Sequence, residues 1–204
     1  MLNNITAVIF DLGGVLIDWN PKYLYKKIFS SEEETDQFLS LICTSDWNET
    51  QDEGRSLTEG TDILVKQFPE YEKEIRAYYD RWEEMLGGVI EETLDILRLL
   101  KAKDHLSLYA LTNWSAETIP IALKRFDFFD LFDGIVVSGE EKMRKPSEKF
   151  YRLILDRYHL SARDTLFIDD NLRNIEGAKS VGLHTIHFNS PGQLRQELDT
   201  EYGL

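Results

Sequence analysis

The chain has 204 residues, of which 42% are hydrophobic and 29% charged, and its formal net charge at pH 7 is −14. This length fits one domain with a modest insertion, and it is enough to bury a core without disulfides or structural metals. The negative charge argues against nucleic acid and anionic membranes as partners, because both would be repelled. A phosphorylated substrate would therefore have to be attracted by a local positive centre.

The cysteine content and the N-terminus indicate the compartment. Cys43 is the only cysteine, so no disulfide can form within the chain, as expected in a reducing cytoplasm. Residues 1–4 lack the charged start of a signal peptide, and no apolar run approaches the length that spans a membrane. We expect a cytoplasmic protein with no membrane partner, and the sequence leaves monomer or dimer undecided.

Short apolar or β-branched segments alternate with helical patterns along most of the chain. The predicted strands are residues 5–10, 106–111, 134–137, 165–168 and 184–187. The predicted helices are residues 91–101, 117–126, 147–158 and 174–181, with a short turn at 161–164. This alternation is typical of an α/β fold with a doubly wound parallel sheet and helices on both faces.

Residues 18–86 interrupt this alternation. They contain no convincing strand, and amphipathic helical patterns at 30–42 and 58–84 are rich in Glu, Lys, Trp and Tyr. A long crossover helix pair packed on the sheet is the alternative, but about 70 residues is too long for such a connection. We therefore predict an inserted helical cap domain at 18–86, above a core formed by 1–17 and 87–204.

Polar residues follow the predicted strands where each strand ends. They are Asp11 after the first strand, Thr112 and Asn113 after the second, Lys145 after the third, and Asp169, Asp170 and Asn174 after the fourth. Taken singly, each could be a turn residue, a helix cap or a solvated charge. Parallel topology, however, brings all these strand ends to one edge of the sheet, which predicts a single polar site there.

Three carboxylates in one small site need compensation. Two unit charges about 4 Å apart repel by roughly 4 kcal/mol at an effective dielectric constant of about 20. Oxygen ligands without nearby His or Cys indicate Mg²⁺, which also takes phosphate oxygens as ligands. Lys145 and Thr112 could then hold a phosphoryl group opposite the metal.

Four motifs stand in the order that is typical of the haloacid dehalogenase (HAD) superfamily. They are Asp11-Leu-Gly-Gly, Leu111-Thr-Asn113, Arg144-Lys-Pro146 and Phe167-Ile-Asp-Asp-Asn171, and the resemblance spans about residues 5–182. The chain most resembles the sugar-phosphate (glucose-1-phosphate-like) phosphatases of this superfamily. The resemblance implies a Rossmann-like core with an α-helical cap, and a Mg²⁺-dependent hydrolase acting on a small phosphorylated metabolite.

The resemblance also implies a role for each motif residue. Asp11 would be the nucleophile and form an aspartyl-phosphate, as carboxylate nucleophiles do. Thr112 and the Asn113 amide would bind the transferring phosphoryl group, and Lys145 would balance its charge and that of Asp11. The metal ligands implied are Asp11, the Gly13 carbonyl and Asp170, with Asp169 and Asn174 in supporting positions.

Gly13 departs from the pattern, because most phosphatases of the superfamily have a second Asp there. That residue protonates the leaving oxygen and later activates water, and such a group contributes typically about 10²–10⁴-fold in rate. Either substrates with better leaving groups, such as anomeric sugar phosphates or acyl phosphates, are favoured, or another carboxylate supplies the proton. The candidates are Asp18, Glu49, Asp52 and Glu53.

Two other functions stay open. A 2-haloacid dehalogenase would use Asp11 without a metal, and Arg55 could bind its carboxylate substrate, but the paired carboxylates Asp169 and Asp170 would then repel the nucleophile. A weakly active phosphosugar-binding or regulatory protein is the other alternative. The acidic segment 46–55 either lines the substrate or is a solvated loop, and Trp114 either walls the pocket or packs in the core.

Overall fold

The computed structural model describes residues 5–204, so residues 1–4, used in the signal-peptide argument, lie outside the described part. Five parallel strands form the central sheet in the order β5-β4-β1-β6-β7. Their bounds are Ala7–Phe10 for β1, Ser107–Thr112 for β4, Gly134–Val137 for β5, Thr165–Asp169 for β6 and His184–His187 for β7. The predicted α/β class and parallel sheet are confirmed.

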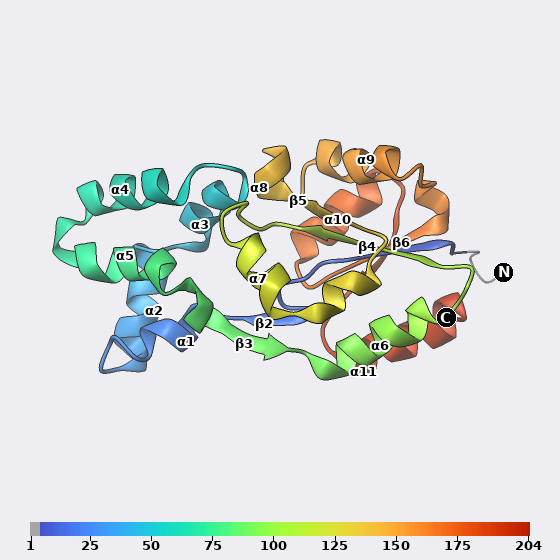
Figure 1. Ribbon diagram of the computed structural model, residues 1–204, viewed down its shortest axis with the longest axis horizontal. Coiled ribbons are helices and arrows are strands. Elements are labelled where there is room, and N and C mark those ends of the chain that lie inside the picture. Colours follow the sequence, from blue (N-terminus) through green and yellow to red (C-terminus); the bar gives the residue numbers. More distant parts are fainter. Residues whose placement is uncertain (1–4) are drawn as a thin grey trace.

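Both faces of the sheet are covered by helices (Figure 1). Val8 and Phe10 of β1 belong to the apolar cluster that includes α6 (Glu91–Lys101) and the start of α11 (Pro191–Glu197). Ile9 points to the other face, into the cluster formed with α9 (Glu148–Arg157) and α10 (Leu172–Ser180). This two-sided burial explains why β1 is an unbroken apolar run and confirms the doubly wound arrangement.

Strand β1 lies at the point where the strand order reverses. Its neighbours are β4 on one side and β6 on the other, so the chain fills the sheet outward from β1 in both directions. In open α/β sheets the crevice at such a point, outside the carboxyl ends of the strands, is where ligands bind. Asp11, the residue directly after β1, therefore stands at the position that the topology favours for a ligand.

The remaining core helices are short. They are α7 (Ile119–Arg125), α8 (Ser138–Glu141), the 3-10 turns η3 (Asp127–Leu131) and η4 (Ala162–Asp164), and the π-helical turn η5 (Leu198–Tyr202). The four helices predicted for the core are all present, with ends shifted by no more than two residues. Within residues 5–204, no helix is both long enough and apolar enough to cross a bilayer.

The segment between β1 and β4 carries a group of helices beyond the strand ends (Figure 1). After the short α1 (Lys22–Tyr25) these are α2 (Glu32–Leu41), α3 (Ser45–Asp52), α4 (Leu57–Gln67) and α5 (Glu72–Asp80). Aromatic side chains hold the group together, with Tyr25 against Phe38 and Trp47 against Tyr78 at ring-centroid distances of 4.8 and 5.0 Å. We propose 18–86 as the extent of this cap.

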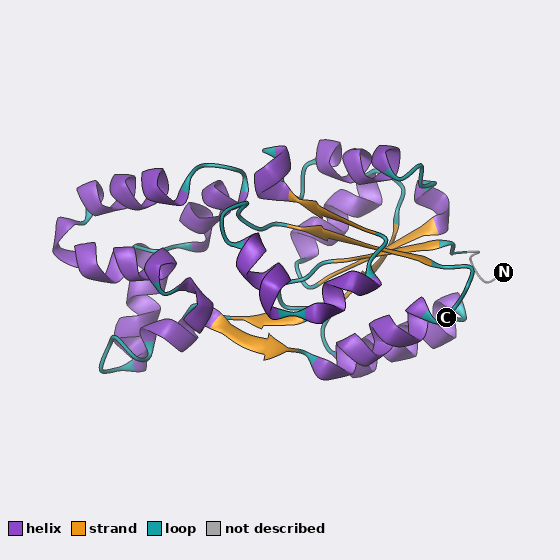
Figure 2. Cartoon of the chain, viewed as in Figure 1, coloured by secondary structure: helices purple, strands orange, loops and turns teal. Residues whose placement is uncertain are grey.

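The expectation that 18–86 contains no strand was wrong at both ends. β2 (Ile17–Trp19) pairs antiparallel with β3 (Leu86–Val89), and this ribbon joins the helical group to the core (Figure 2). These strands are too short to show an alternating pattern, and β3 contains two glycines, which are rare in strands. The single pattern at 58–84 also divides into α4 and α5, because Pro69 cannot continue a helix.

Truncation of one core leucine on α6 tests the described packing. Leu97 is fully buried, whereas Leu99 on the same helix is 55% exposed. We expect Leu97→Ala to lower the free energy of unfolding by about 2–5 kcal/mol, because it removes buried contacts and leaves a cavity. Leu99→Ala is the matched control and should change it little. Urea unfolding followed by circular dichroism measures both, and equal effects would contradict this orientation of α6.

Candidate active site

The strand ends bring three charged side chains into direct contact. Lys145 Nζ lies 2.9 Å from Asp11 Oδ1 and 2.7 Å from Asp169 Oδ2. Lys145 and Asp169 are fully buried, and Asp11 is 8% exposed. Lys145 thus stands between two carboxylates from adjacent strands, and it is the buried cation that the sequence predicted at this edge of the sheet.

The carboxylates keep Lys145 charged. Burial alone lowers the pKa of Lys145, but the negative charges of Asp11 and Asp169 outweigh this and raise it above its usual value. A buried ammonium group of this kind is stable only when its partners are fixed and well placed.

Asp11 is held in an environment that disfavours its charge. Burial raises the pKa of Asp11 to about 8; Lys145 opposes this rise, and the charges of Asp169 and Asp170 add to it. The main-chain N–H of Leu12 donates to Asp11 Oδ1 at 2.7 Å. A further cation next to Asp11 would favour the ionised form that a nucleophile needs.

Asp169 is fully occupied by hydrogen bonds. Its oxygens accept from the main-chain N–H of Asn171 at 2.8 Å and from the side-chain amide of Asn174, 3.0 Å from each oxygen. The Asn174 carbonyl in turn accepts from the Tyr151 hydroxyl at 2.7 Å. With Lys145 added, Asp169 is suited to hold the lysine in place rather than to bind a ligand.

The three carboxylates are also close enough to share a metal ion. Asp11, Asp169 and Asp170 each offer an oxygen within 4.8 Å of the others. The carboxyl of Asp170 is more open to solvent, and its partial burial together with the charge of Asp169 raises its pKa. An all-oxygen set with unbalanced negative charge fits Mg²⁺. Of the three carboxylates, only Asp169 accepts hydrogen bonds from Asn174, so Asp11 and Asp170 are the better candidates for metal ligands.

Thr112, the last residue of β4, and Asn113, the residue after it, differ in how their polar groups are used. Thr112 is buried, and among residues 5–204 no hydrogen-bond partner satisfies its hydroxyl. A buried unpaired hydroxyl is costly, so it points to a ligand oxygen at this position. The side chain of Asn113 is engaged, because its two ends bond the main-chain N–H and carbonyl of Lys145 at 2.9 and 3.0 Å.

A cavity of about 70 Å³ lies between the helical cap and the core. Its aromatic walls are Trp19, Tyr79, Trp82 and Trp114, and its remaining lining residues are Gly13, Asn48, Asp52, Asn113, Ser115 and Thr118. Trp114 also packs on Trp82 with ring centroids 5.6 Å apart, so it has both of the roles that the sequence left open. The cavity adjoins the site through Gly13, two residues after Asp11.

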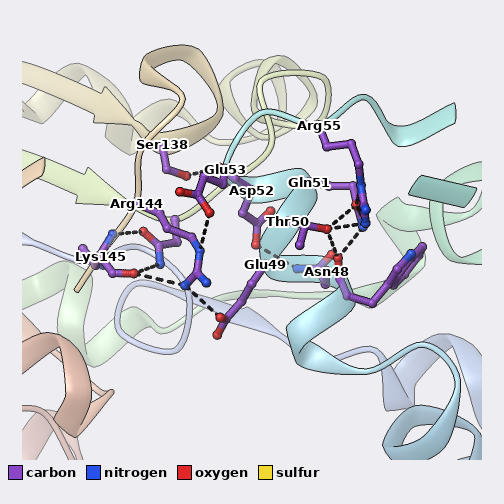
Figure 3. Close-up of polar contacts among 12 residues, drawn as sticks. Asn48, Glu49, Thr50, Gln51, Asp52, Glu53, Arg55, Ser138, Arg144 and Lys145 are labelled. Carbon is purple, nitrogen blue, oxygen red and sulfur yellow. Dashed lines mark hydrogen bonds and ion pairs between the residues drawn. The ribbon is translucent and has the colours of Figure 1, made fainter. Parts of the chain in front are cut away.

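Helix α3 is fixed against the core by charged contacts (Figure 3). Arg144 pairs with Glu49 at 2.8 Å and with Glu53 at 3.2 Å, and Arg173 pairs with Glu49 at 2.6 Å. The Ser138 hydroxyl adds a hydrogen bond to the Asp52 carbonyl. These contacts place the end of α3 at the mouth of the strand-end site.

The segment 46–55 is therefore mostly helix rather than a solvated loop, and it lines the cavity through Asn48 and Asp52. Arg55 is not aimed at the site, because its guanidinium donates to Gln51 and to Thr50 of its own segment (Figure 3).

Sequence reasoning identified only part of the cap side of the cavity. The segment 46–55, which supplies Asn48 and Asp52, was a candidate, but Tyr79, Trp82 and Trp19 on β2 were not. The only signal for them was the high Trp and Tyr content of 18–86, which does not separate pocket residues from packing residues. The Asn113 clamp on Lys145 was also missed, because it joins residues 32 positions apart.

A change at Gly14 tests the close approach of Asp170 to the loop after β1. Gly14 has φ +74°, and a Cβ there would lie 2.3 Å from Asp170 Oδ2. We expect Gly14→Ala to destabilise the fold by about 1–3 kcal/mol and to weaken Mg²⁺ binding, because Asp170 must move. Gly192→Ala, where a Cβ meets nothing within 4 Å, is the control. Calorimetry of unfolding and of Mg²⁺ binding measures both, and wild-type values for Gly14→Ala would contradict the geometry.

Known proteins of the same kind match over nearly the whole chain. The sesquiterpene phosphatase astK of Aspergillus oryzae is 32% identical over 191 residues, which cover 92% of this chain and 92% of that protein. A phosphorylated carbohydrates phosphatase of Thermotoga maritima is 27% identical over 192 residues, 89% of this chain and 83% of that protein.

A solved structure and a family model agree with these two similarities. The HAD family enzyme bt-2542 of Bacteroides thetaiotaomicron, solved with magnesium and inorganic phosphate, superposes with a TM-score of 0.67 at 25% identity over 91% of this chain and 94% of that one. The family model for haloacid dehalogenase-like hydrolases matches residues 5–182, which include the whole strand-end site. The chain therefore belongs to the haloacid dehalogenase-like hydrolases.

Proposed function

We propose that this protein is a Mg²⁺-dependent phosphatase that hydrolyses a small phosphate monoester through an aspartyl-phosphate on Asp11. The observation that carries the proposal is the pairing of a buried cation with a buried, unsatisfied hydroxyl at the same strand ends. Lys145 contacts Asp11, and the Thr112 hydroxyl has no partner in the described chain. A phosphoryl group bound beside Asp11 would use both.

The residues of the chain then have distinct tasks. An oxygen of Asp11 attacks phosphorus, and Lys145, the Thr112 hydroxyl and the main-chain N–H of Asn113 offset charge on the phosphoryl oxygens. The Asn113 side chain, engaged with Lys145, keeps that lysine in position. Mg²⁺ held by Asp11, the Gly13 carbonyl and Asp170 would supply Lewis-acid charge stabilisation. The magnesium and phosphate bound by the Bacteroides enzyme support this assignment.

The contacts of Arg55 weigh against the dehalogenase alternative. That alternative needed Arg55 to bind a carboxylate substrate, and its guanidinium is instead bonded within the cap to Gln51. A metal-free site would also leave Asp170 uncompensated beside Asp11, since Lys145 pairs with Asp11 and Asp169. A Mg²⁺-dependent phosphatase does not need Arg55 to bind a carboxylate, and its metal ion would balance the charge of Asp170.

The cavity favours a small polyol or triose-sized leaving group. Its volume of about 70 Å³ accommodates roughly five water-sized groups at about 10–15 Å³ each. Its aromatic faces suit C–H surfaces, and Asn48, Ser115 and Thr118 offer hydrogen bonds to hydroxyls. The name of the Thermotoga relative points the same way, whereas the sesquiterpenyl group in the name of the Aspergillus relative is several times larger than this cavity.

Loss of the nucleophile and loss of the metal test the proposed reaction. We expect Asp11→Asn to abolish hydrolysis of phosphate monoesters, because an amide cannot form the aspartyl-phosphate. Removal of Mg²⁺ with a chelator should abolish turnover of the wild type, and added Mg²⁺ should restore it. Release of inorganic phosphate from sugar, acyl and aryl phosphates is the measurement. Chelator-resistant turnover, or no hydrolysis of any of these esters, would overturn the proposal.

The size of the cavity predicts which substrates are preferred. We expect kcat/KM for phosphates of small sugars or polyols to exceed that for farnesyl phosphate by at least about tenfold, since the larger group must displace cap side chains. Steady-state kinetics on this panel at saturating Mg²⁺ measures the difference. Comparable values for farnesyl phosphate would show that the cap opens to admit long apolar chains, and the size argument would fail.

A further inference from the structure

The proposed phosphatase lacks a proton donor at Gly13, and four carboxylates could replace it. Three of them are engaged elsewhere. Asp18 on β2 accepts from the Tyr23 hydroxyl at 2.7 Å. Glu49 pairs with two arginines, at 2.8 and 2.6 Å, and Glu53 pairs with Arg144 at 3.2 Å with its side chain half exposed. These three acids also lie outside the set of residues that line the cavity.

Asp52 is the one of these four acids that lies in the cavity wall. It lines the cavity together with Gly13 and Asn113, which flank the proposed phosphoryl site. Among the ion pairs of residues 5–204 it has no partner. The side-chain amide of Asn48 donates to Asp52 Oδ2 at 2.9 Å, which fixes the carboxyl in the cavity wall (Figure 3).

We propose that Asp52, on the cap helix α3, is the general acid and base of this site, in the place of the aspartate that is absent at position 13. This proposal rests on the proposed phosphatase function. In the first step an Asp11 oxygen bonds to phosphorus, the bond from phosphorus to the leaving oxygen breaks, and the Asp52 carboxyl gives its proton to that oxygen. In the second step the Asp52 carboxylate takes a proton from water as that water attacks phosphorus, and phosphate leaves Asp11.

The surroundings of Asp52 keep a proton available near neutral pH. Burial and the neighbouring charge of Glu49 raise the pKa of Asp52 to about 7, against the opposing effects of the Ser115 main-chain N–H and Arg144. The groups facing it from α5 are Tyr78 and Tyr79, and burial raises the pKa of both phenols, so they stay neutral. A donor whose pKa lies near the working pH is efficient in both directions.

Stability does not explain a carboxylate at this place. Asp52 is the last residue of α3, where the negative end of the helix dipole disfavours an anion. Because its pKa in the folded protein lies above the ordinary value, the folded state holds the proton more tightly, and Asp52 costs stability as pH rises through the interval from about 4 to 7. A purely structural role predicts the opposite sign.

The test compares leaving groups that do and do not need a proton. With Asp52→Asn, we expect kcat/KM to fall by about 10²–10⁴-fold for benzyl phosphate, whose alkoxide is a poor leaving group. For 4-nitrophenyl phosphate, whose phenolate leaves unaided, the loss should be much smaller. Asp80→Asn is the matched control, since Asp80 is an exposed carboxylate that also ends a cap helix, and it should leave both rates unchanged.

The wild type provides a second measurement that needs no variant. Ionisation of Asp11 affects both esters alike, and above about pH 7 both esters are dianions, so in that range the ratio of kcat/KM for benzyl phosphate to that for 4-nitrophenyl phosphate isolates the donor. We expect this ratio to fall above about pH 7, and the fall to disappear in Asp52→Asn. We also expect Asp52→Asn to unfold at the same or a higher temperature than the wild type at pH 8.

The possible outcomes separate the two proposals. Equal losses for the two esters in Asp52→Asn, or a wild-type ratio that does not change with pH, would overturn the role of Asp52 and leave the phosphatase function standing. A protein that hydrolyses neither ester with Mg²⁺ would overturn the phosphatase function itself. A lower unfolding temperature for Asp52→Asn at pH 8 would favour a structural role.

Discussion

The buried contact of Lys145 with Asp11 and Asp169 is the interaction on which the site depends. Removing an ammonium group and two carboxylates from water is costly, and it is tolerated only where every partner is fixed. The fold provides this fixation: Asp11 and Asp169 stand at the ends of adjacent buried strands, and Asn113 and Asn174 bond the lysine loop and Asp169. The sheet, with helices on both faces, therefore positions charges that could not be held on a mobile loop.

The sequence predicted that the strand-end residues lie close together, because Asp11 directly follows a buried strand and Thr112 and Asp169 end buried strands. Asp11, Thr112 and Asp169 are located once the apolar runs are recognised, and parallel topology then brings them together. The cap side could not be predicted in the same way. Tyr79 reaches the cavity only through the packing of α5, which local pattern does not specify, and β2 and β3 are too short to leave a periodic signal.

The cap and the strand-end site are linked through two arginines of the core. Arg144, which holds Glu49 and Glu53 of α3, is the residue before Lys145. Arg173 reaches Glu49 from α10, one residue before Asn174, which binds Asp169. Displacement of α3 would thus break the ion pairs of Arg144 and Arg173. These arginines adjoin Lys145, which contacts Asp11, and Asn174, which binds Asp169. A docked cap and an ordered charge centre are for this reason expected to form together.

A proton donor on the cap makes protonation of the leaving group depend on the position of α3. In a site with an acid two residues after the nucleophile, both groups belong to one loop and are present whether or not the cap is docked. Here Gly13 contributes no side chain, and the ion pairs of Glu49 hold the helix that carries Asp52 against the core. On the proposed mechanism, any movement of α3 away from the core would remove the acid and the cap wall of the cavity together. A phosphoryl group bound with the cap open would face Lys145 and Asp11 without a proton donor, so poor leaving groups would be retained until α3 docks.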